Sequence, residues 1–265
     1  MPDDTYTHGH HDSVLRSHRW RTVENSATYL VPRLRPGLDV LDIGCGPGTI
    51  TADLAGRVNP GRVLGLDRST DAVAQATAAN AGFENLDFGV GDVYALDTED
   101  DSFDVVHAHQ VLQHLSDPVT ALREMRRVCR PDGVVAVRDA DYAAFTWAPD
   151  DGRLTAWLDI YRQVARANGA EPDAGRYLKS WALEAGFTDV TASASVWCFS
   201  DAADRQWWGD LWADRVVSSD LARQAIDGGL ATRADLESIA TAFRAWVEQP
   251  DGWFAVLHGE VLARG

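Results

Sequence analysis

Short apolar runs alternate with longer stretches of helical pattern between Leu38 and Asp139. The runs are rich in Val, Ile and Leu and end at turn residues, which predicts buried strands. The stretches between them repeat apolar residues every three or four positions, which predicts helices. The expected strands span 39–43, 62–67, 86–89, 103–107 and 133–139, and the expected helices span 49–58, 70–81 and 118–129. This order is typical of βαβ units around a parallel sheet.

The flanking regions extend this pattern. Residues 12–35 are expected to form one or two helices, and 150–168, 174–185 and 201–248 further helices. Alternating apolar positions predict two more strands, at 188–199 and 253–263. A chain of 265 residues is long enough for one large domain with insertions. The sequence therefore predicts an α/β fold with a doubly wound, seven-stranded, mostly parallel sheet, an antiparallel last strand and helical insertions.

A glycine-rich turn follows the first strand, in the sequence VLDIGCGPGT at 40–49. Gly44, Gly46 and Gly48 stand where the backbone must turn tightly and where a ligand can approach without meeting a Cβ. A glycine-rich turn alone is weak evidence, but its place between a strand and a helix is typical of a Rossmann-like nucleotide-binding loop. Asp67 ends the next strand, where a carboxylate can accept hydrogen bonds from both ribose hydroxyls. Its alternative role is to cap the following helix, a role for which Ser69 competes.

The glycine spacing bears on the choice of nucleotide. NAD-type turns read GxGxxG or GxGxxA, whereas here the glycines alternate as GxGxG after the acidic Asp42. Two further motifs follow, GDVYAL at 91–96 after the third strand and DSFDVV at 101–106 at the start of the fourth. An NAD-linked oxidoreductase is therefore the weaker interpretation.

With these motifs in order, the stretch 38–141 resembles the core of class I S-adenosylmethionine-dependent methyltransferases, particularly the subgroup that includes the ubiquinone and menaquinone biosynthesis C-methyltransferases. DIGCGPG at 42–48 is similar to the first motif of that family, LGLDRS at 64–69 to the acidic end of its second strand, and GDVYAL to its adenine-contacting motif. FDVVHAHQVLQHLSDP at 103–118 resembles the segment after the fourth strand, and RPDGVVAVRD at 130–139 the fifth-strand hairpin. The resemblance is close over this stretch and loose over the rest of the chain.

The resemblance implies S-adenosyl-L-methionine as the cofactor. The glycines would line its methionine and ribose portion, and Asp42 would orient the loop and reach the methionine ammonium. Asp67 would hold the ribose hydroxyls, and Asp92 would accept a hydrogen bond from the adenine amino group. His109 and Gln110 would lie near the reactive methyl, although the family often carries a small or polar residue at these positions. The expected cofactor-binding residues are Asp42, Gly44, Gly46, Gly48, Asp67, Arg68, Asp92, Val93, His109 and Gln110.

The same interpretation divides the domain into three segments. Residues 1–36 would form an N-terminal helical lid, residues 37–141 the cofactor-binding Rossmann-like core, and residues 142–265 a C-terminal part with substrate-side helical insertions and closing strands. In the lid, HRWR at 18–21 could pair Arg19 or Arg21 with the cofactor carboxylate. The alternative is that these arginines are solvated on a helix surface.

Methyl transfer from a sulfonium is an in-line displacement, so the alignment of the two reactants is the main task. A general base is needed only if the acceptor must lose a proton. His109 and Asp139 are the candidate catalytic residues, because they follow the fourth strand and end the fifth, where doubly wound folds bind their ligands. His114 and Asp141 are further candidates, with loop hydrogen bonding and capping as their structural alternatives.

The charge balance excludes several partner classes. With 24 Lys and Arg against 40 Asp and Glu, the formal net charge is -16, and such a surface repels nucleic acid and anionic membranes. The three cysteines lie apart without CxxC spacing, and HGHH at 8–11 lacks a Cys or carboxylate partner, so no metal is expected. There is neither a signal peptide nor an apolar run that could span a bilayer, so a cytoplasmic protein is expected.

The chain has ten tryptophans, most of them after residue 141. Most are expected to pack helices onto the sheet, and the others would line an apolar acceptor pocket or form an aromatic cage for a cationic amine. The expected function is methyl transfer from S-adenosylmethionine to the carbon, oxygen or nitrogen of a small molecule, by a monomer or homodimer. The alternatives are a non-catalytic cofactor-binding protein of the same fold, an NAD-linked oxidoreductase, and methylation of RNA or protein.

Overall fold

The computed structural model describes residues 12–265, with side chains from residue 16 onward. Its strands are β1 (Val40–Ile43), β2 (Val63–Asp67), β3 (Leu86–Val90), β4 (Phe103–His109), β5 (Cys129–Ala140), β6 (Thr146–Ala148), β7 (Asp189–Phe199) and β8 (Trp253–Arg264). Its α-helices are α1 (Asp12–Arg19), α2 (Val23–Ser26), α3 (Thr49–Val58), α4 (Thr70–Ala79), α5 (Pro118–Val128), α6 (Gly152–Ala167), α7 (Leu178–Glu184), α8 (Ala202–Ser218), α9 (Asp220–Asp227) and α10 (Arg233–Val247). Short 3₁₀ turns are η1 (Thr28–Arg33), η2 (Leu112–His114), η3 (Tyr142–Ala144) and η4 (Ala174–Arg176).

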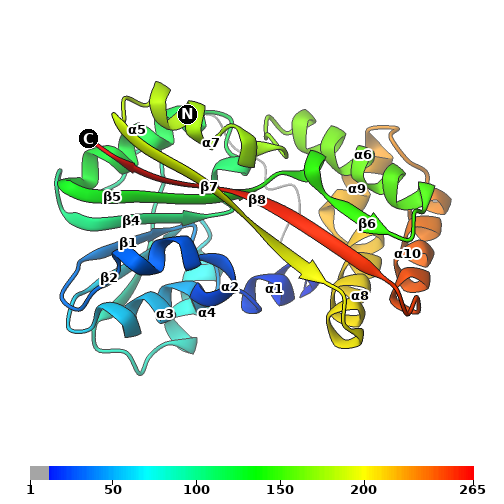
Figure 1. Cartoon of the computed structure of the whole chain (residues 1–265), viewed down its shortest axis with the longest axis horizontal. Helices are drawn as coiled ribbons and strands as arrows, with labels where there is room; N and C mark the ends of the chain where they lie inside the picture. The colour runs from blue at the N-terminus through cyan, green and yellow to red at the C-terminus, as the bar shows by residue number, and fades with distance from the viewer. Residues whose placement is uncertain (1–11) are drawn as a thin grey trace.

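The described strands form one sheet in the order β3-β2-β1-β4-β5-β8, and β6 and β7 also pair with β8. The strands from β3 to β5 pair in parallel, whereas β8 is antiparallel to β5, β6 and β7. Because β7 pairs with residues of β8 that also pair with β5 or β6, β7 must lie on the opposite edge of β8 (Figure 1). The predicted Rossmann-like α/β fold with an antiparallel last strand is confirmed, and the short β6 makes the sheet eight-stranded rather than seven-stranded.

The fifth strand is longer than predicted. β5 begins at Cys129, ahead of the expected start at residue 133. The pairing with β4 shifts there, because Phe103 pairs with Cys129 whereas Val105 pairs with Val134. The Pro and Gly of this segment therefore lie at an irregularity inside the strand.

Helices cover both faces of the parallel part of the sheet, as a doubly wound fold requires (Figure 1). Along β5, Val134 and Ala136 pack with residues of α2, α3 and η1, whereas Val135 and Val137 pack with residues of α5 and α7. Successive strand residues point to opposite faces, so one continuous apolar run serves two hydrophobic cores. This explains why the central strands read as apolar throughout.

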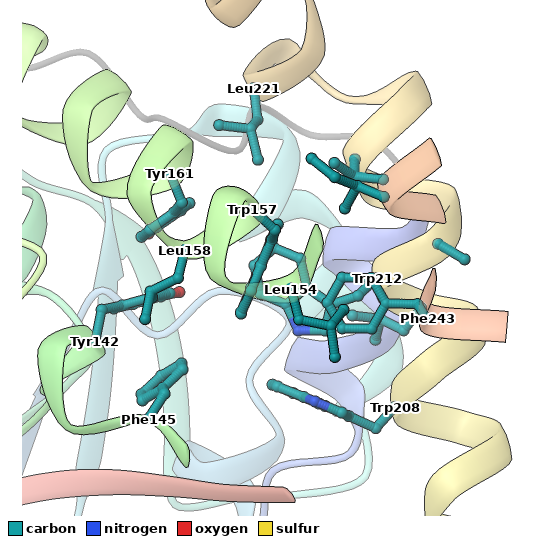
Figure 2. Packing of buried hydrophobic residues seen from close by; sticks show 14 of the residues in the cluster. Tyr142, Phe145, Leu154, Trp157, Leu158, Tyr161, Trp208, Trp212, Leu221 and Phe243 are labelled. Carbon is teal, nitrogen blue, oxygen red and sulfur yellow. The ribbon is translucent and has the colours of Figure 1, made fainter. Parts of the chain in front are cut away.

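A third hydrophobic core joins the C-terminal helices to the far end of β8. Trp157 of α6 is buried against Trp212 of α8, with ring centroids 4.5 Å apart, and against Phe243 of α10, at 5.1 Å. Figure 2 shows these side chains meeting between the helices. Edge-to-face aromatic pairs of this kind stabilise beyond their buried area. The helical bundle is thereby fixed beside the carboxyl ends of the parallel strands (Figure 1).

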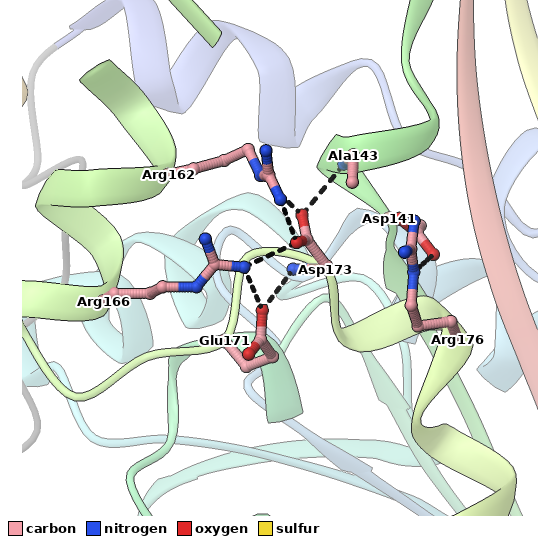
Figure 3. A network of polar contacts seen from close by, with 7 residues as sticks. All are labelled: Asp141, Ala143, Arg162, Arg166, Glu171, Asp173 and Arg176. Atoms are coloured by element: carbon pink, nitrogen blue, oxygen red, sulfur yellow. Dashed lines mark hydrogen bonds and ion pairs between the residues drawn. The ribbon is translucent and has the colours of Figure 1, made fainter. Parts of the chain in front are cut away.

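An ion-pair network fixes the segment that follows α6 (Figure 3). The carboxylate of Asp173 accepts hydrogen bonds from Arg162 and Arg166 of α6 and from the backbone N–H of Ala143, at 2.6 to 3.0 Å. Burial raises the pKa of Asp173, but the two guanidinium groups outweigh it and hold the pKa below its ordinary value. This network ties α6 to η3, which directly follows β5.

Replacing Trp157 with alanine should lower the free energy of unfolding by about 3–5 kcal/mol, because it removes a fully buried indole from the junction of three elements. Urea denaturation followed by far-UV circular dichroism measures this. Leu183→Ala is the control, because Leu183 is 51% exposed and its loss should change stability by less than about 1 kcal/mol. Equal effects of the two substitutions would contradict the packing described here.

Candidate functional site

A cavity of about 1140 Å³ opens at the carboxyl ends of the parallel strands. It lies where the strand order reverses between β1 and β4, which is where open α/β sheets bind their ligands. The glycine turn after β1, the end of β2, the turn after β3 and the end of β4 all contribute lining residues. On its other side the cavity is lined by α1, α8 and the end of β7. The sequence motifs and the C-terminal helices therefore face the same space.

The glycine turn has the backbone that only glycine adopts readily. Gly44 and Gly48 have φ of 67° and 80°, and a Cβ at these positions would lie 2.4 Å from Val111 Cγ2 and 2.7 Å from Phe88 Cζ respectively. Gly44 and Gly46 line the cavity, whereas Gly48 packs against Phe88 and begins α3. The turn thus places backbone, rather than side chains, along one wall of the cavity.

Asp42 lies on β1 directly before this turn and lines the cavity. One carboxylate oxygen accepts a 2.6 Å hydrogen bond from the Thr51 hydroxyl, and the other lies 2.7 Å from Nδ1 of His107 on β4. The carboxylate is therefore fixed by α3 and by the neighbouring strand. Since each oxygen has a second lone pair, it can still accept a hydrogen bond from a ligand.

Asp67 ends β2 and connects the glycine turn to the next helix. Its carboxylate accepts hydrogen bonds from the backbone N–H of Gly46, at 3.0 Å, and of Ser69, at 2.9 Å. Ser69 itself caps α4, since its hydroxyl accepts from the N–H of Ala72. Asp67 and Arg68 both line the cavity, and the cap of α4 belongs to Ser69.

The turn after β3 contributes the third acidic residue. Asp92 accepts a 3.0 Å hydrogen bond from the backbone N–H of Tyr94, which fixes the turn, and Val93 is buried beside it. Asp92 and Val93 both line the cavity. The three predicted acidic positions therefore lie on the same side of the cavity as the glycine turn.

The N-terminal segment packs across the opposite wall. Trp20, directly after α1, contacts Trp197 of β7 and Trp207 of α8 with ring centroids 5.1 and 4.9 Å apart. Ser17 accepts a hydrogen bond from Arg215 of α8 at 3.0 Å. Arg21 lines the cavity, whereas Arg19 is exposed and does not. The HGHH positions lie outside the described residues.

Gln110 joins the N-terminal segment to the sheet. Its φ is 54°, which is uncommon for a residue with a side chain, and its N–H donates to the carbonyl of Arg138 at 2.7 Å. The amide oxygen accepts from Arg21 at 2.7 Å, and the amide nitrogen lies 2.8 Å from Nε2 of His258. Nδ1 of His258 lies 3.1 Å from the carbonyl of Val256, so Nδ1 donates and Nε2 accepts. These contacts form one chain from Arg21 to β8.

His109 ends β4 and lines the cavity, 5.8 Å from Trp197 between ring centroids. It is buried, and neither ring nitrogen has a hydrogen-bond partner among the described residues. Burial, followed by the charges of Arg21 and Arg138, holds the pKa of His109 well below its ordinary value. The imidazole is therefore neutral at physiological pH and can donate one hydrogen bond and accept another.

The two aspartates near the end of β5 lie outside the cavity lining. Asp139 is fully buried and accepts a 3.0 Å hydrogen bond from the backbone N–H of Gln113, and burial raises its pKa to about 7. Asp141 forms a two-pronged ion pair with Arg176, at 2.6 and 2.7 Å (Figure 3). His114, in contrast, lines the cavity and lies 3.0 Å from the amide nitrogen of Gln113.

The side of the cavity opposite the glycine turn is aromatic. We call six of its lining residues the aromatic wall: Tyr142, Phe145, Trp197, Trp207, Trp208 and Trp212. Sequence reasoning missed Arg215, which lines the cavity beside this wall and is 4% exposed, with its guanidinium 4.7 Å from the ring centroid of Trp212. The spacing of positions 208, 212 and 215 on one helix was the available signal, because such residues share a face.

Comparisons with known proteins agree with this geometry. A family described as "Methyltransferase domain" matches residues 34–186. An uncharacterized methyltransferase of Schizosaccharomyces pombe is 33% identical over 97% of this chain and 95% of its own length. The chain belongs to the methyltransferase-domain family. The resemblance to class I S-adenosylmethionine-dependent methyltransferases is confirmed, and S-adenosylmethionine is the cofactor.

The methyltransferase is also similar to a second relative and to a solved structure. A demethylmenaquinone methyltransferase of Beutenbergia cavernae is 36% identical over 55% of this chain and 58% of its own length. The crystal structure of a Haemonchus contortus phosphoethanolamine N-methyltransferase, solved with S-adenosylhomocysteine, matches with a TM-score of 0.59 at 14% identity, over 96% of this chain and 57% of that one. At such low identity the second similarity concerns the fold alone.

Within residues 12–265, no three His, Cys, Asp or Glu side chains are grouped so that they could hold a metal ion. None of the described helices combines the length and apolar character that a membrane crossing requires. All three cysteines are free thiols.

Asp139 should make the stability of the methyltransferase depend on pH. Its pKa rises from 3.8 to about 7 in the folded state, so the stability that it contributes is complete below pH 3.8 and is lost as the pH rises through 7. Relative to Asp139→Asn, the free energy of unfolding of the unmodified protein should fall between pH 4 and 7, by at most about 1.4 kcal/mol per pH unit.

Denaturant titrations of both proteins at each pH measure the difference between their free energies of unfolding. The contribution of the histidines to the pH dependence cancels in this difference, because both proteins contain them. A difference that stays constant from pH 4 to 8 would show that Asp139 ionises normally.

Proposed function

We propose that this methyltransferase transfers a methyl group to a small molecule that binds against the aromatic wall. The observation that carries the proposal is that a single cavity is lined on one side by the glycine turn and Asp67, and on the other by the aromatic wall. A cofactor bound on one side and an acceptor bound on the other can therefore come into contact within the same cavity. The volume of about 1140 Å³ exceeds what one drug-sized ligand needs.

The residues of the first side fit S-adenosylmethionine, which supplies an electrophilic methyl group on a sulfonium. Asp42, Asp67 and Asp92 carry negative charge, and each is fixed by hydrogen bonds from the protein. We assign Asp67 to the ribose hydroxyls, Asp92 and Val93 to the adenine, and Asp42 to the methionine ammonium. Gly44 and Gly46 present no side chain to the cofactor, and Arg68 and Gln110 complete the set.

The neutral His109 suits a positioning role better than that of a strong base. A histidine whose pKa is held low by burial and by neighbouring guanidinium groups takes up a proton poorly. Its two ring nitrogens can instead orient a polar group of the acceptor through hydrogen bonds. Asp139 supports this arrangement indirectly, since it fixes the backbone of Gln113, which lines the cavity.

The segment 1–36 acts as a lid in this proposal. Its described part places Arg21 in the cavity, and Trp20 packs against Trp197 and Trp207 of the aromatic wall. Residues 37–141 hold the cofactor, and residues 142–265 provide the wall that faces the acceptor. Closure of the lid would exclude water from the reacting centre.

Calorimetric titration with S-adenosylmethionine, S-adenosylhomocysteine and NAD tests the cofactor side. We expect micromolar binding of the first two and none of NAD, because three carboxylates and the GxGxG turn form that wall. Turnover is then followed as release of S-adenosylhomocysteine with a panel of aromatic, carboxylic and amine acceptors. Tight binding of NAD alone would refute the proposal.

Replacing Asp67 with alanine should weaken binding of S-adenosylhomocysteine by about 100-fold or more, because it removes the ribose acceptor and releases the N–H of Gly46. Asp67→Asn should weaken this binding less, because the amide keeps one oxygen that can accept a hydrogen bond. Asp71→Ala is the matched control, because Asp71 is exposed on α4 and lies outside the cavity lining. Unchanged affinity of Asp67→Ala for S-adenosylhomocysteine would contradict the assignment of Asp67 to the ribose hydroxyls.

A further inference from the structure

Gln110 connects a residue of the cavity lining to a residue buried behind it. Its side-chain amide lies between two partners that are far apart in the sequence. The amide oxygen is 2.7 Å from a guanidinium nitrogen of Arg21, and the amide nitrogen is 2.8 Å from Nε2 of His258 on β8. Arg21 and Gln110 line the cavity, whereas His258 is fully buried and lies outside the lining. A residue outside the cavity therefore has a direct hold on a residue inside it.

The direction of these hydrogen bonds follows from the protonation of His258. Its Nδ1 faces the carbonyl of Val256, and a carbonyl only accepts, so Nδ1 carries a proton. Burial, followed by the charges of Arg138 and Arg21, holds the pKa of His258 well below its ordinary value, so Nδ1 carries the single proton of a neutral ring. Nε2 is then an acceptor and must face the amide nitrogen of Gln110. The amide oxygen is thereby left for Arg21, whose guanidinium only donates.

The ring of His258 is fixed by its neighbours. It packs on the indole of Trp197, with ring centroids 4.3 Å apart, and is stacked with His109 at 6.3 Å. The indole nitrogen of Trp197 donates to the carbonyl of Asn25, and its ring contacts Trp20. The sheet therefore holds the N-terminal segment at two adjacent points, one through Trp197 and one through the amide that His258 orients.

Resting on the lid assignment of the proposed function, we propose that His258 is a positioning residue that orients the amide of Gln110 toward Arg21 and so keeps the lid closed. This hydrogen bond adds to the other contacts of Arg21. In the reverse orientation the amide NH₂ group would face a guanidinium, and neither group can accept. Without the Nε2 acceptor nothing selects the productive orientation, and residues 17–27 are released more often from the cavity.

The tautomer of His258 gives the first test. Imidazole ¹⁵N chemical shifts of the unmodified, cofactor-free protein at pH 7.5, assigned through the contact with Trp197, should show a neutral ring protonated on Nδ1. A ring protonated on Nε2, or on both nitrogens, would overturn the proposal, because Nε2 could not then accept from Gln110. This measurement decides even if variants of His258 fail to fold.

Hydrogen exchange measures the lid itself. His258→Phe keeps an aromatic ring against Trp197 and loses the acceptor. The amides that residues 17–27 protect by backbone hydrogen bonds should exchange about tenfold faster in this variant, as the loss of one hydrogen bond to a charged group predicts. Val261→Ala is the matched control, because Val261 is buried on the same strand but packs in the core under α5 and α7. Equal exchange in His258→Phe and the unmodified protein, or equal acceleration in both variants, would overturn the proposal.

A double-mutant cycle separates orientation from general destabilisation. Gln110→Glu places an oxygen on both ends of the side chain, so Arg21 keeps an acceptor whichever way the group faces. His258→Phe should therefore accelerate exchange of residues 17–27 in the protein with Gln110 and have little effect in the Gln110→Glu background. The same acceleration in both backgrounds would show that His258 acts through packing alone, and would overturn the proposal.

The link to the cofactor is tested separately. Labelled S-adenosylhomocysteine, chased with an excess of unlabelled compound, should dissociate about threefold or more faster from His258→Phe than from the unmodified protein, because an open lid retains it less well. Unchanged dissociation together with faster exchange would overturn the role of this contact in the lid. Failure of the unmodified protein to bind S-adenosylhomocysteine would instead contradict the proposed function, and it would leave the tautomer and exchange results standing.

Discussion

The parallel pairing of five strands is the constraint on which the rest of the molecule depends. Parallel strands end on the same side of a sheet, so the polar residues that follow β1, β2, β3 and β4 are brought to one edge although they are far apart in sequence. The reversal of strand order between β1 and β4 opens a crevice at that edge. The N-terminal segment and the C-terminal helices then cover the crevice, which turns an open edge into a walled cavity.

The way in which β8 is paired determines what covers the edge. β8 is antiparallel to its neighbours, and its N-terminal part extends beyond β5. The first residues of β8 therefore pair with β6 and β7 beside the C-terminal helices. The third hydrophobic core, around Trp157 and Phe254, fixes α6, α8 and α10 at that end. Since α8 carries Trp208, Trp212 and Arg215, the packing of this core sets the position of this part of the cavity lining.

The two sides of the cavity differ in how far the sequence could predict them. Gly44, Asp67 and Asp92 each lie at or just after the end of a strand, and the parallel topology brings strand ends together, so local motifs were sufficient to place them beside one cavity. The opposite side is assembled from α1, η3, β7 and α8, which have no motif in common. Residues such as Trp197 and Arg215 therefore could not be associated before the fold was known. Asp139 shows the converse, because a strand end alone does not reveal whether its carboxylate lines the cavity or is buried outside the lining.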